Sequence, residues 1–369
     1  SDLFNYLGQA HLFTDLGANP LVEPALEVNQ AIEAIEGSPD PLLSTYMTAY
    51  ASTPSIYGPG WTLISAPATW LSSSYFIGLL YLKGLAWLAF LASAYLLKRI
   101  VEKLRPSSAA EALYLFSWNP LVLLMAVGDG HNDAVMMAAV LLGFWFVLRD
   151  SWALAFGAMA FSASIKYVGA LFIPLIALYA WDRSRTGERG RPLLVLLQGG
   201  LAAGVVTGLL YAALGSAEWG TGLFNRMLVP QNWAWKGNLV WPPTLLLAGG
   251  LVAFLAAYLG LAGRLATALS GAGCGKGRSR QLQRGLSSPK DSRAQQLFDV
   301  GFSISLLLFV LGAARSQPWH LIWPASLAGM SAKRWAWVPV IALSAVLLLS
   351  QVWVEWGTPD LVTLLSEVI

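Results

Sequence analysis

Long apolar runs separated by short polar segments make up most of the chain beyond residue 70. A helix rises about 1.5 Å per residue, so it needs roughly 20 apolar residues to cross the hydrocarbon core of a bilayer. Five runs come close to that length: Tyr75 to Leu97, Pro192 to Leu214, Trp241 to Leu261, Phe298 to Ala313 and Trp335 to Val354. The pattern therefore predicts transmembrane helices at these places, in an all-α polytopic integral membrane protein.

Two shorter runs, Trp152 to Ser164 and Val168 to Ala180, fall well short of a bilayer crossing. Charged residues flank the pair at both far ends, and Lys166 lies between the two runs. We expect a hairpin of short membrane-embedded helices, with Lys166 at an apex that is either recessed below the outer surface or meets a locally thinned bilayer.

The runs Asn119 to Val127 and Ala134 to Leu148 form another short-armed hairpin in the same way. Asn119-Pro120 is expected to kink or restart its first arm, and the polar turn Gly128 to Asp133 lies at its apex. Non-helical backbone at membrane depth is tolerated only beside protein or a water-filled cavity. Two recessed apices therefore predict a cavity open to the outer leaflet.

Composition and charge fix the setting and the orientation. The mean hydropathy is +0.58, and 56% of the residues are hydrophobic. This is more apolar surface than the core of a soluble protein could bury. Lys and Arg gather at residues 98–105, 149, 183–191, 264–293 and 333–334. The positive-inside rule makes these segments cytoplasmic, so both hairpin apices face the extracytoplasmic side of a plasma membrane.

Residues 1–70 are too long for a simple loop, and Leu26 to Ile35 has helical patterning interrupted nearby by prolines. We expect short amphipathic helices on the outer membrane face, followed by a transmembrane domain over residues 71–369. Within that domain, the Gly/Ser-rich basic stretch 264–297 is expected to be a flexible cytoplasmic loop near anionic head groups, with nucleic acid as the less favoured partner. Because the chain begins with Ser1 in a polar segment, we also expect a transmembrane helix upstream of it.

Six short motifs follow one another in a defined order, and the order is more specific than any single motif. Together they resemble the polyprenol-phosphate-mannose-dependent mannosyltransferases of the GT-C class, over the chain from Ser1 to about Trp323. The motifs are Asp2-Leu-Phe-Asn-Tyr6, Gly17-Ala-Asn19-Pro20, Tyr57-Gly-Pro59-Gly-Trp61, Trp118-Asn119-Pro120, Gly130-His131-Asn132-Asp133 and Lys166-Tyr167.

The resemblance implies a glycosyltransferase with a GT-C-like helical bundle. The donor would be a sugar on a polyprenyl phosphate, with mannose favoured by the resemblance alone, and the acceptor a glycolipid or polysaccharide. Asp2 matches the acidic residue that this class carries in its first outer loop, which implies a general base for an inverting displacement. Many GT-C enzymes have two adjacent acids there, whereas Leu3 follows Asp2 here, so the metal-dependent members are poorer models.

The leaving lipid phosphate needs cations and hydrogen-bond donors in a water-poor site. Lys166, Arg226, Lys236 and Arg315 lie outside the cytoplasmic clusters and are the candidate cations, whereas Lys83, within the first long span, is left outside the expected site. The candidate binding residues are completed by Asp129, His131, Asn132, Asp133 and His320. The alternative for Asn132 and Asp133 is a capping role for the helix that follows them.

A divalent metal held by Asp129, His131 and Asp133 is a further alternative, but one histidine among carboxylates is a loose pattern, and we expect no cofactor. Most tryptophans near span ends, including Trp61, Trp319 and Trp323, are expected to form interfacial belts. Two other functions remain open. A polyprenyl-lipid transporter or flippase also uses intramembrane charge, and a non-catalytic subunit would bind a lipid-linked sugar without turning it over.

Overall fold

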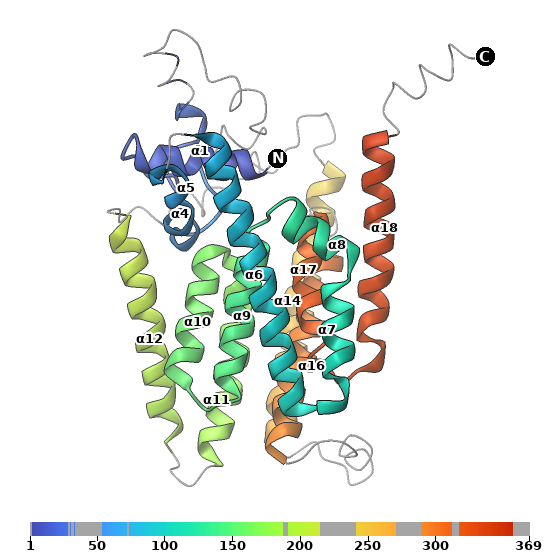
Figure 1. Ribbon diagram of the computed structural model, residues 1–369. Coiled ribbons are helices and arrows are strands. Elements are labelled where there is room, and N and C mark those ends of the chain that lie inside the picture. The colour runs from blue at the N-terminus through green and yellow to red at the C-terminus, as the bar shows by residue number, and fades with distance from the viewer. Residues whose placement is uncertain are drawn as a thin grey trace, which may run out of the picture.

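The computed structural model describes residues 2–28, 30, 33, 54–71, 74–186, 191–214, 241–270, 289–311 and 317–356. Throughout these residues the fold is helical, and its single β-type contact is an isolated bridge between Pro24 and Pro54. The long helices run side by side, and short helices lie across one end (Figure 1). The predicted all-α class is confirmed.

Four helices are long and apolar enough to cross a membrane. They are α6 (Tyr75–Leu104), α12 (Pro192–Ala213), α14 (Trp241–Leu269) and α16 (Pro289–Leu311). Each coincides with a predicted span, which confirms those spans. α14 and α16 also continue into the stretch predicted to be a flexible loop, so the segment 264–297 is helical at both of its ends.

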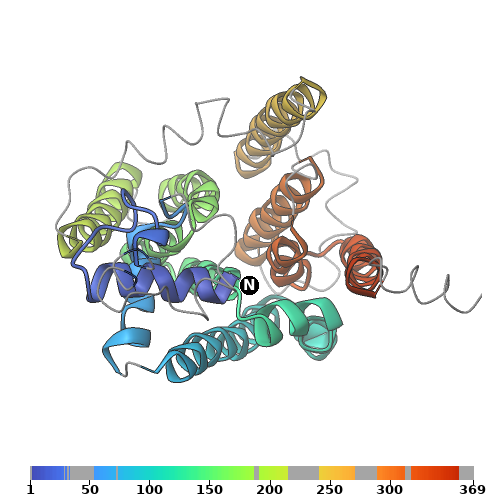
Figure 2. The ribbon, with the colours of Figure 1, turned by 90° about the horizontal axis from the view of Figure 1, so that it is seen from above.

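The fifth predicted span corresponds to α18 (Trp337–Trp356), which follows the short turn η7 (Arg334–Ala336). Its part with described side chains, Trp337–Leu349, is apolar but shorter than a full crossing. Viewed from above, α18 stands at the edge of the bundle (Figure 2).

The first short hairpin begins after η2 (Pro106–Ser108) and α7 (Ala109–Ser117). The chain then restarts at Pro120 as α8 (Pro120–Val122), with the Asn119 side chain accepting hydrogen bonds from the backbone of residues 121 and 122. The helix directions before and after this break differ by 53°, as the Asn-Pro pair predicts. A π-helical turn, η3 (Leu123–Gly128), leads to the apex, and α9 (Asp133–Val147) returns.

The second hairpin consists of α10 (Trp152–Ile165), the 3₁₀ turn η4 (Tyr167–Phe172) and α11 (Ile173–Arg185), with Lys166 at the apex as predicted. The 15 residues of α9 correspond to about 22 Å of helix, against roughly 30 Å for a hydrocarbon core. Because the last residues of α9 lie at the basic end of the bundle, its first residue, Asp133, lies below the opposite surface.

Short helices cover the apices. α1 (Asp2–Thr14) lies crosswise over the ends of the long helices, with α4 (Pro59–Ser65) and α5 (Pro67–Trp70) beneath it (Figures 1 and 2). Leu3, Tyr6, Leu7 and Ala10 have the three- and four-residue spacing of one helix face, and all four are buried. Burial of this face fixes the first turn of α1, which carries Asp2, over the bundle.

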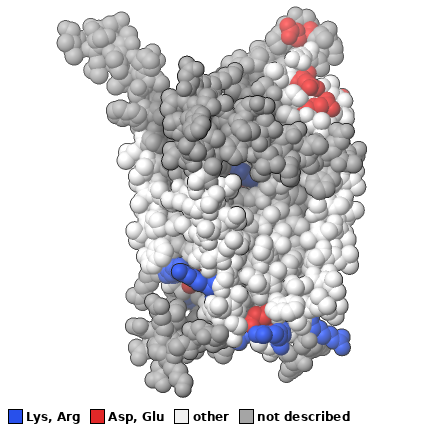
Figure 3. Space-filling view, turned by 180° about the vertical axis from the view of Figure 1, so that it is seen from behind, with Lys and Arg blue, Asp and Glu red and all other residues white. Residues whose placement is uncertain are grey.

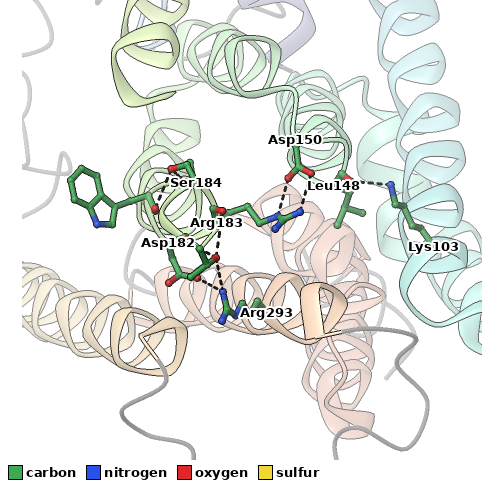
Figure 4. Close-up of polar contacts among 10 residues, drawn as sticks. Lys103, Leu148, Asp150, Asp182, Arg183, Ser184 and Arg293 are labelled. Atoms are coloured by element: carbon green, nitrogen blue, oxygen red, sulfur yellow. Dashed lines mark hydrogen bonds and ion pairs between the residues drawn. The ribbon is translucent and has the colours of Figure 1, made fainter. Parts of the chain in front are cut away.

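The two ends of the bundle differ in charge. Lys and Arg gather at the end away from α1, and Asp and Glu are visible near the covered end (Figure 3). At the basic end, Arg183 pairs with Asp150 at 3.3 Å, Arg293 pairs with Asp182 at 2.9 Å, and Lys103 donates to the Leu148 carbonyl at 2.9 Å (Figure 4). These contacts join the ends of α6, α9, α11 and α16.

Helix α12 exposes much of its apolar surface. Along this helix Leu193, Leu197, Leu201 and Leu209 are each more than 60% exposed, and Gly199 is the buried position. Exposed leucine side chains are stable there only in an apolar solvent, which agrees with a membrane setting.

The segment Tyr57 to Trp61 connects the cover to the second apex. Pro59 begins α4, and just before it the Gly58 amide donates to the Ile165 carbonyl at 3.2 Å. A Cβ on Gly58 would collide with the backbone carbonyl of Ser164. Glycine is needed there for close approach, since its φ of −86° is ordinary.

We expect Gly58→Ala to lower the stability of the protein by about 1–3 kcal/mol, the usual cost of overpacking. Thermal unfolding in detergent, followed by tryptophan fluorescence, measures the change. Gly84→Ala is the matched control, because a Cβ there meets nothing within 4 Å, and it should unfold at or above the wild-type temperature. Equal unfolding temperatures for the two variants would refute the close contact.

Candidate active site

The first apex places a histidine between two carboxylates. His131 Nδ1 lies 3.5 Å from Asp2 Oδ2, and Nε2 lies 3.9 Å from Asp129 Oδ2. The imidazole is buried, the Asp2 side chain is 15% exposed, and that of Asp129 is 49% exposed. The group therefore opens to the surface on the Asp129 side.

The backbone of the turn explains how these side chains meet. Gly130 has a φ of +71°, which L side chains rarely adopt, and a Cβ there would press on Leu3 of α1. Lys83 Nζ of α6 donates to the Gly128 carbonyl at 2.8 Å. Lys83 was left outside the expected site, yet it holds the end of the π-helical turn that leads to His131.

The second group is a buried ion pair that joins the two apices. Lys166 Nζ lies 2.9 Å from both carboxylate oxygens of Asp133, whose side chain has no exposed surface. The indole N–H of Trp323, on α17 (Ile322–Ala328), also donates to Asp133 Oδ1. As the first residue of α9, Asp133 further gains from the partial positive charge of the helix N-terminus.

Stacked aromatic rings connect the two groups. Trp319, in the turn η6 (Pro318–Leu321), stacks on His131 with ring centroids 4.1 Å apart. His320 stacks on Trp323 at 4.5 Å. Tyr57 completes the enclosure, because Lys166 Nζ lies 5.7 Å from its ring centroid.

His320 is a neutral hydrogen-bond donor. Burial, and secondly the charge of Lys166, lower the pKa of this imidazole to about 3. Its Nδ1 accepts a hydrogen bond from the Gln317 amide at 3.1 Å, so the proton of the neutral ring is assigned to Nε2. This N–H remains a donor at any physiological pH.

The Tyr57 hydroxyl is likewise kept protonated. Burial, and then the nearby charge of Asp2, raise the pKa of Tyr57 well above its ordinary value. Tyr6 donates to the Tyr57 oxygen at 3.4 Å, and both rings are buried under α1.

The structure contradicts the capping role considered above for Asn132. It occupies the position before α9, but its side chain makes no capping hydrogen bond. Both polar atoms of its amide are buried and have no hydrogen-bond partner among the described residues. An unsatisfied buried polar group costs about 1–3 kcal/mol, which is unfavourable for a purely structural residue.

Six of the residues expected at the site come together: Asp2, Asp129, His131, Asp133, Lys166 and His320. Asn132 lies in the same turn. Arg226, Lys236 and Arg315 fall outside the described residues. Trp61 and Trp323 are 2% and 7% exposed, so the expectation of an interfacial belt is wrong for these two.

The contacts of Trp319 and Trp323 with the site were not predicted from the sequence. Their neighbours Pro318 and His320 offered a signal, since a histidine between two tryptophans in a short Pro-initiated turn places three rings together.

An apolar cavity also borders Trp323, lined by Met136, Val168, Leu171, Phe172, Ile304 and Leu308. Among the described residues, no group of three or more His, Cys, Asp or Glu side chains is arranged to hold a metal ion.

The fold and the site define a class: an all-α polytopic membrane protein with a buried charged cluster where short hairpins meet a cover of short helices. The sequence comparisons agree with that class. Residues 1–182 match the family model described as alpha-(1->6)-mannopyranosyltransferase, N-terminal domain. This match, over just under half of the chain, confirms the resemblance to GT-C mannosyltransferases.

Two curated relatives carry the same description, "Alpha-(1->6)-mannopyranosyltransferase A". The protein of Corynebacterium glutamicum is 24% identical over 233 residues, covering 59% of this chain and 45% of the relative. The protein of Mycobacterium tuberculosis is 24% identical over 220 residues, covering 58% of this chain and 38% of the relative. The chain thus spans less than half the length of these relatives. No solved structure matches it.

We expect Lys166→Met to destabilise the protein by about 3–5 kcal/mol, because it leaves the buried Asp133 carboxylate without a cation. The double variant Lys166→Met/Asp133→Asn should be more stable than the single variant, since it buries no unpaired charge. Thermal unfolding of the two variants and the wild type measures this coupling. A single variant at least as stable as the double variant would contradict the pairing.

Proposed function

We propose that this protein transfers mannose from a polyprenyl-phosphate-linked donor to a glycolipid or polysaccharide acceptor, with inversion, on the extracytoplasmic face of the plasma membrane. One observation carries the proposal. The Asp2 carboxylate lies 3.5 Å from His131, in the same cluster as the Lys166 ammonium. A candidate base and a candidate phosphate ligand are thus brought together, although they lie far apart in the sequence.

The chemistry is a single displacement. Asp2 accepts the proton of the acceptor hydroxyl as that oxygen attacks the anomeric carbon, and the bond between this carbon and the phosphate oxygen breaks. The phosphate leaves with the electron pair, and the configuration at the anomeric carbon inverts. His131, facing Asp2 through Nδ1, orients the carboxylate.

Charge on the leaving phosphate is met by donors around Trp323. The Lys166 ammonium donates to both carboxylate oxygens of Asp133. Because an ammonium group has three N–H bonds, the third N–H can donate to a phosphate oxygen. The His320 Nε2–H lies beside the same indole. Since the Asp133 carboxylate already balances Lys166, Arg226 and Arg315 are proposed to supply the remaining positive charge.

The sugar and the prenyl chain have separate places in this scheme. Asn132, with its unsatisfied amide, and Asp129 at the exposed edge offer hydrogen bonds to sugar hydroxyls. The prenyl chain is proposed to lie in the surrounding lipid, because the apolar cavity beside Trp323 has room for only about one water molecule.

Asp2→Asn should reduce the turnover number by roughly 10²–10⁴-fold, the usual contribution of a well-placed general base. Release of polyprenyl phosphate from polyprenyl-phosphate-mannose, with glycolipid acceptors in lipid nanodiscs, measures it. Donor binding should persist, because the amide keeps the size and position of the carboxylate.

Asp15→Asn is the matched control, since Asp15 directly follows α1 and its side chain is 56% exposed. It should turn over at the wild-type rate. Equal activity of the two variants would exclude Asp2 as the base. Donor binding without turnover in the wild type, with every acceptor, would instead indicate a non-catalytic subunit.

The proposed orientation has its own test. In a Cys274→Ser background, Leu16→Cys should react with a membrane-impermeant maleimide in intact cells, whereas Arg185→Cys should react only after permeabilisation. Both positions are exposed, at 45% and 55%, and they lie at opposite ends of the bundle. The reverse labelling pattern would place the site on the cytoplasmic side.

A further inference from the structure

Three cations converge on one indole ring at the basic end of the bundle, far from the candidate active site. The guanidinium carbon of Arg149 lies 4.5 Å from the ring centroid of Trp145, near the end of α9. Arg99 and Lys103 of α6 each place their charged group 5.8 Å from the same centroid. All three distances lie within the range of cation–π attraction, so two helices fix positive charge around a single ring.

The described residues leave this cluster strongly positive. Glu102 lies 3.5 Å from Lys98 and 3.6 Å from Arg99, and so offsets one charge. Arg149 forms no ion pair with a described carboxylate, and Asp150, next to it in the sequence, pairs with Arg183. The excess of positive charge favours an anionic ligand.

An apolar surface runs from the cluster along the same faces of both helices. On α6, Leu88, Leu91 and Tyr95 are 61%, 43% and 61% exposed, and Tyr95 lies one turn before Arg99. On α9, Leu142 is 38% exposed and lies one turn before Trp145. Positive charge next to this apolar strip matches the two parts of a phospholipid.

We propose that Arg99, Lys103 and Arg149, arranged around Trp145, bind the phosphate head group of an anionic phospholipid in the leaflet at the basic end. Its acyl chains lie on the apolar strip of α6 and α9. The site differs from a diffuse attraction for anionic membranes, because the three charged groups are fixed by one ring and, for Lys103, by its hydrogen bond to Leu148 (Figure 4). A bound lipid joins α6 to α9, the helices that carry Lys83 and Asp133.

The experiment uses native mass spectrometry of the full chain with phosphatidylglycerol as the probe and phosphatidylcholine as the reference. The wild type is expected to retain phosphatidylglycerol in preference to phosphatidylcholine. Arg99→Gln/Arg149→Gln should weaken that binding by roughly 30-fold, the effect of losing two cations near an anionic head group. Arg99→Lys/Arg149→Lys keeps the charge and should bind nearly as the wild type does.

The matched control is Arg191→Gln/Arg264→Gln, which removes the same charge from two exposed positions at the same end of the bundle. It should bind phosphatidylglycerol as the wild type does, and all variants should unfold at the wild-type temperature in phosphatidylcholine alone. Equal losses in the two glutamine variants, or no preference in the wild type, would overturn the proposal. Thermal stabilisation by inorganic phosphate as large as that by phosphatidylglycerol would overturn it too, in favour of a soluble anion.

Discussion

The buried ion pair between Asp133 and Lys166 is the interaction on which the covered end of the molecule depends. Each residue lies at the apex of a hairpin too short to reach the surface, where an isolated charge would be expensive to bury. Either hairpin alone would bury an unpaired charge. Together they neutralise each other's charge, and the Trp323 indole satisfies a further lone pair of the carboxylate. The pair thereby sets the depth and relative position of α9 and α10.

Broken helices supply the remaining geometry. The Asn119 cap and the π-helical turn end the first arm early, and the glycine at 130 lets the chain reverse direction against Leu3. As a result, non-helical backbone and its polar side chains lie inside the bundle, beside protein rather than lipid. The crosswise α1 covers this region and adds Asp2. A reaction on a lipid-linked sugar, as proposed, needs this kind of boundary between apolar and polar surroundings.

Periodicity and charge were enough to predict the spans, both hairpins and the clustering of Asp2, His131 and Lys166 at one end, because run length and flanking charge determine depth in a membrane. Run length and flanking charge do not determine how a helix is rotated about its axis, and therefore which side chains face the site. For that reason Trp323 was assigned to an interfacial belt, although its indole faces Asp133. The same limit applies to Asn132, since composition identifies a capping residue type but not whether its side chain turns back to the helix. Lys83 was set aside because a lysine within a span has several apolar explanations, and only the fold shows Gly128 beside it.

The stacking of Trp319 on His131 has a consequence for how such a protein can be divided. The stretch that matches the family model ends at residue 182, yet Trp319, His320 and Trp323 enclose the imidazole and the ion pair from the far side of the chain. The boundary recognised in the sequence therefore cuts through a single physical unit. A chain cut at that boundary would lack the ring that stacks on His131 and the indole that donates to Asp133.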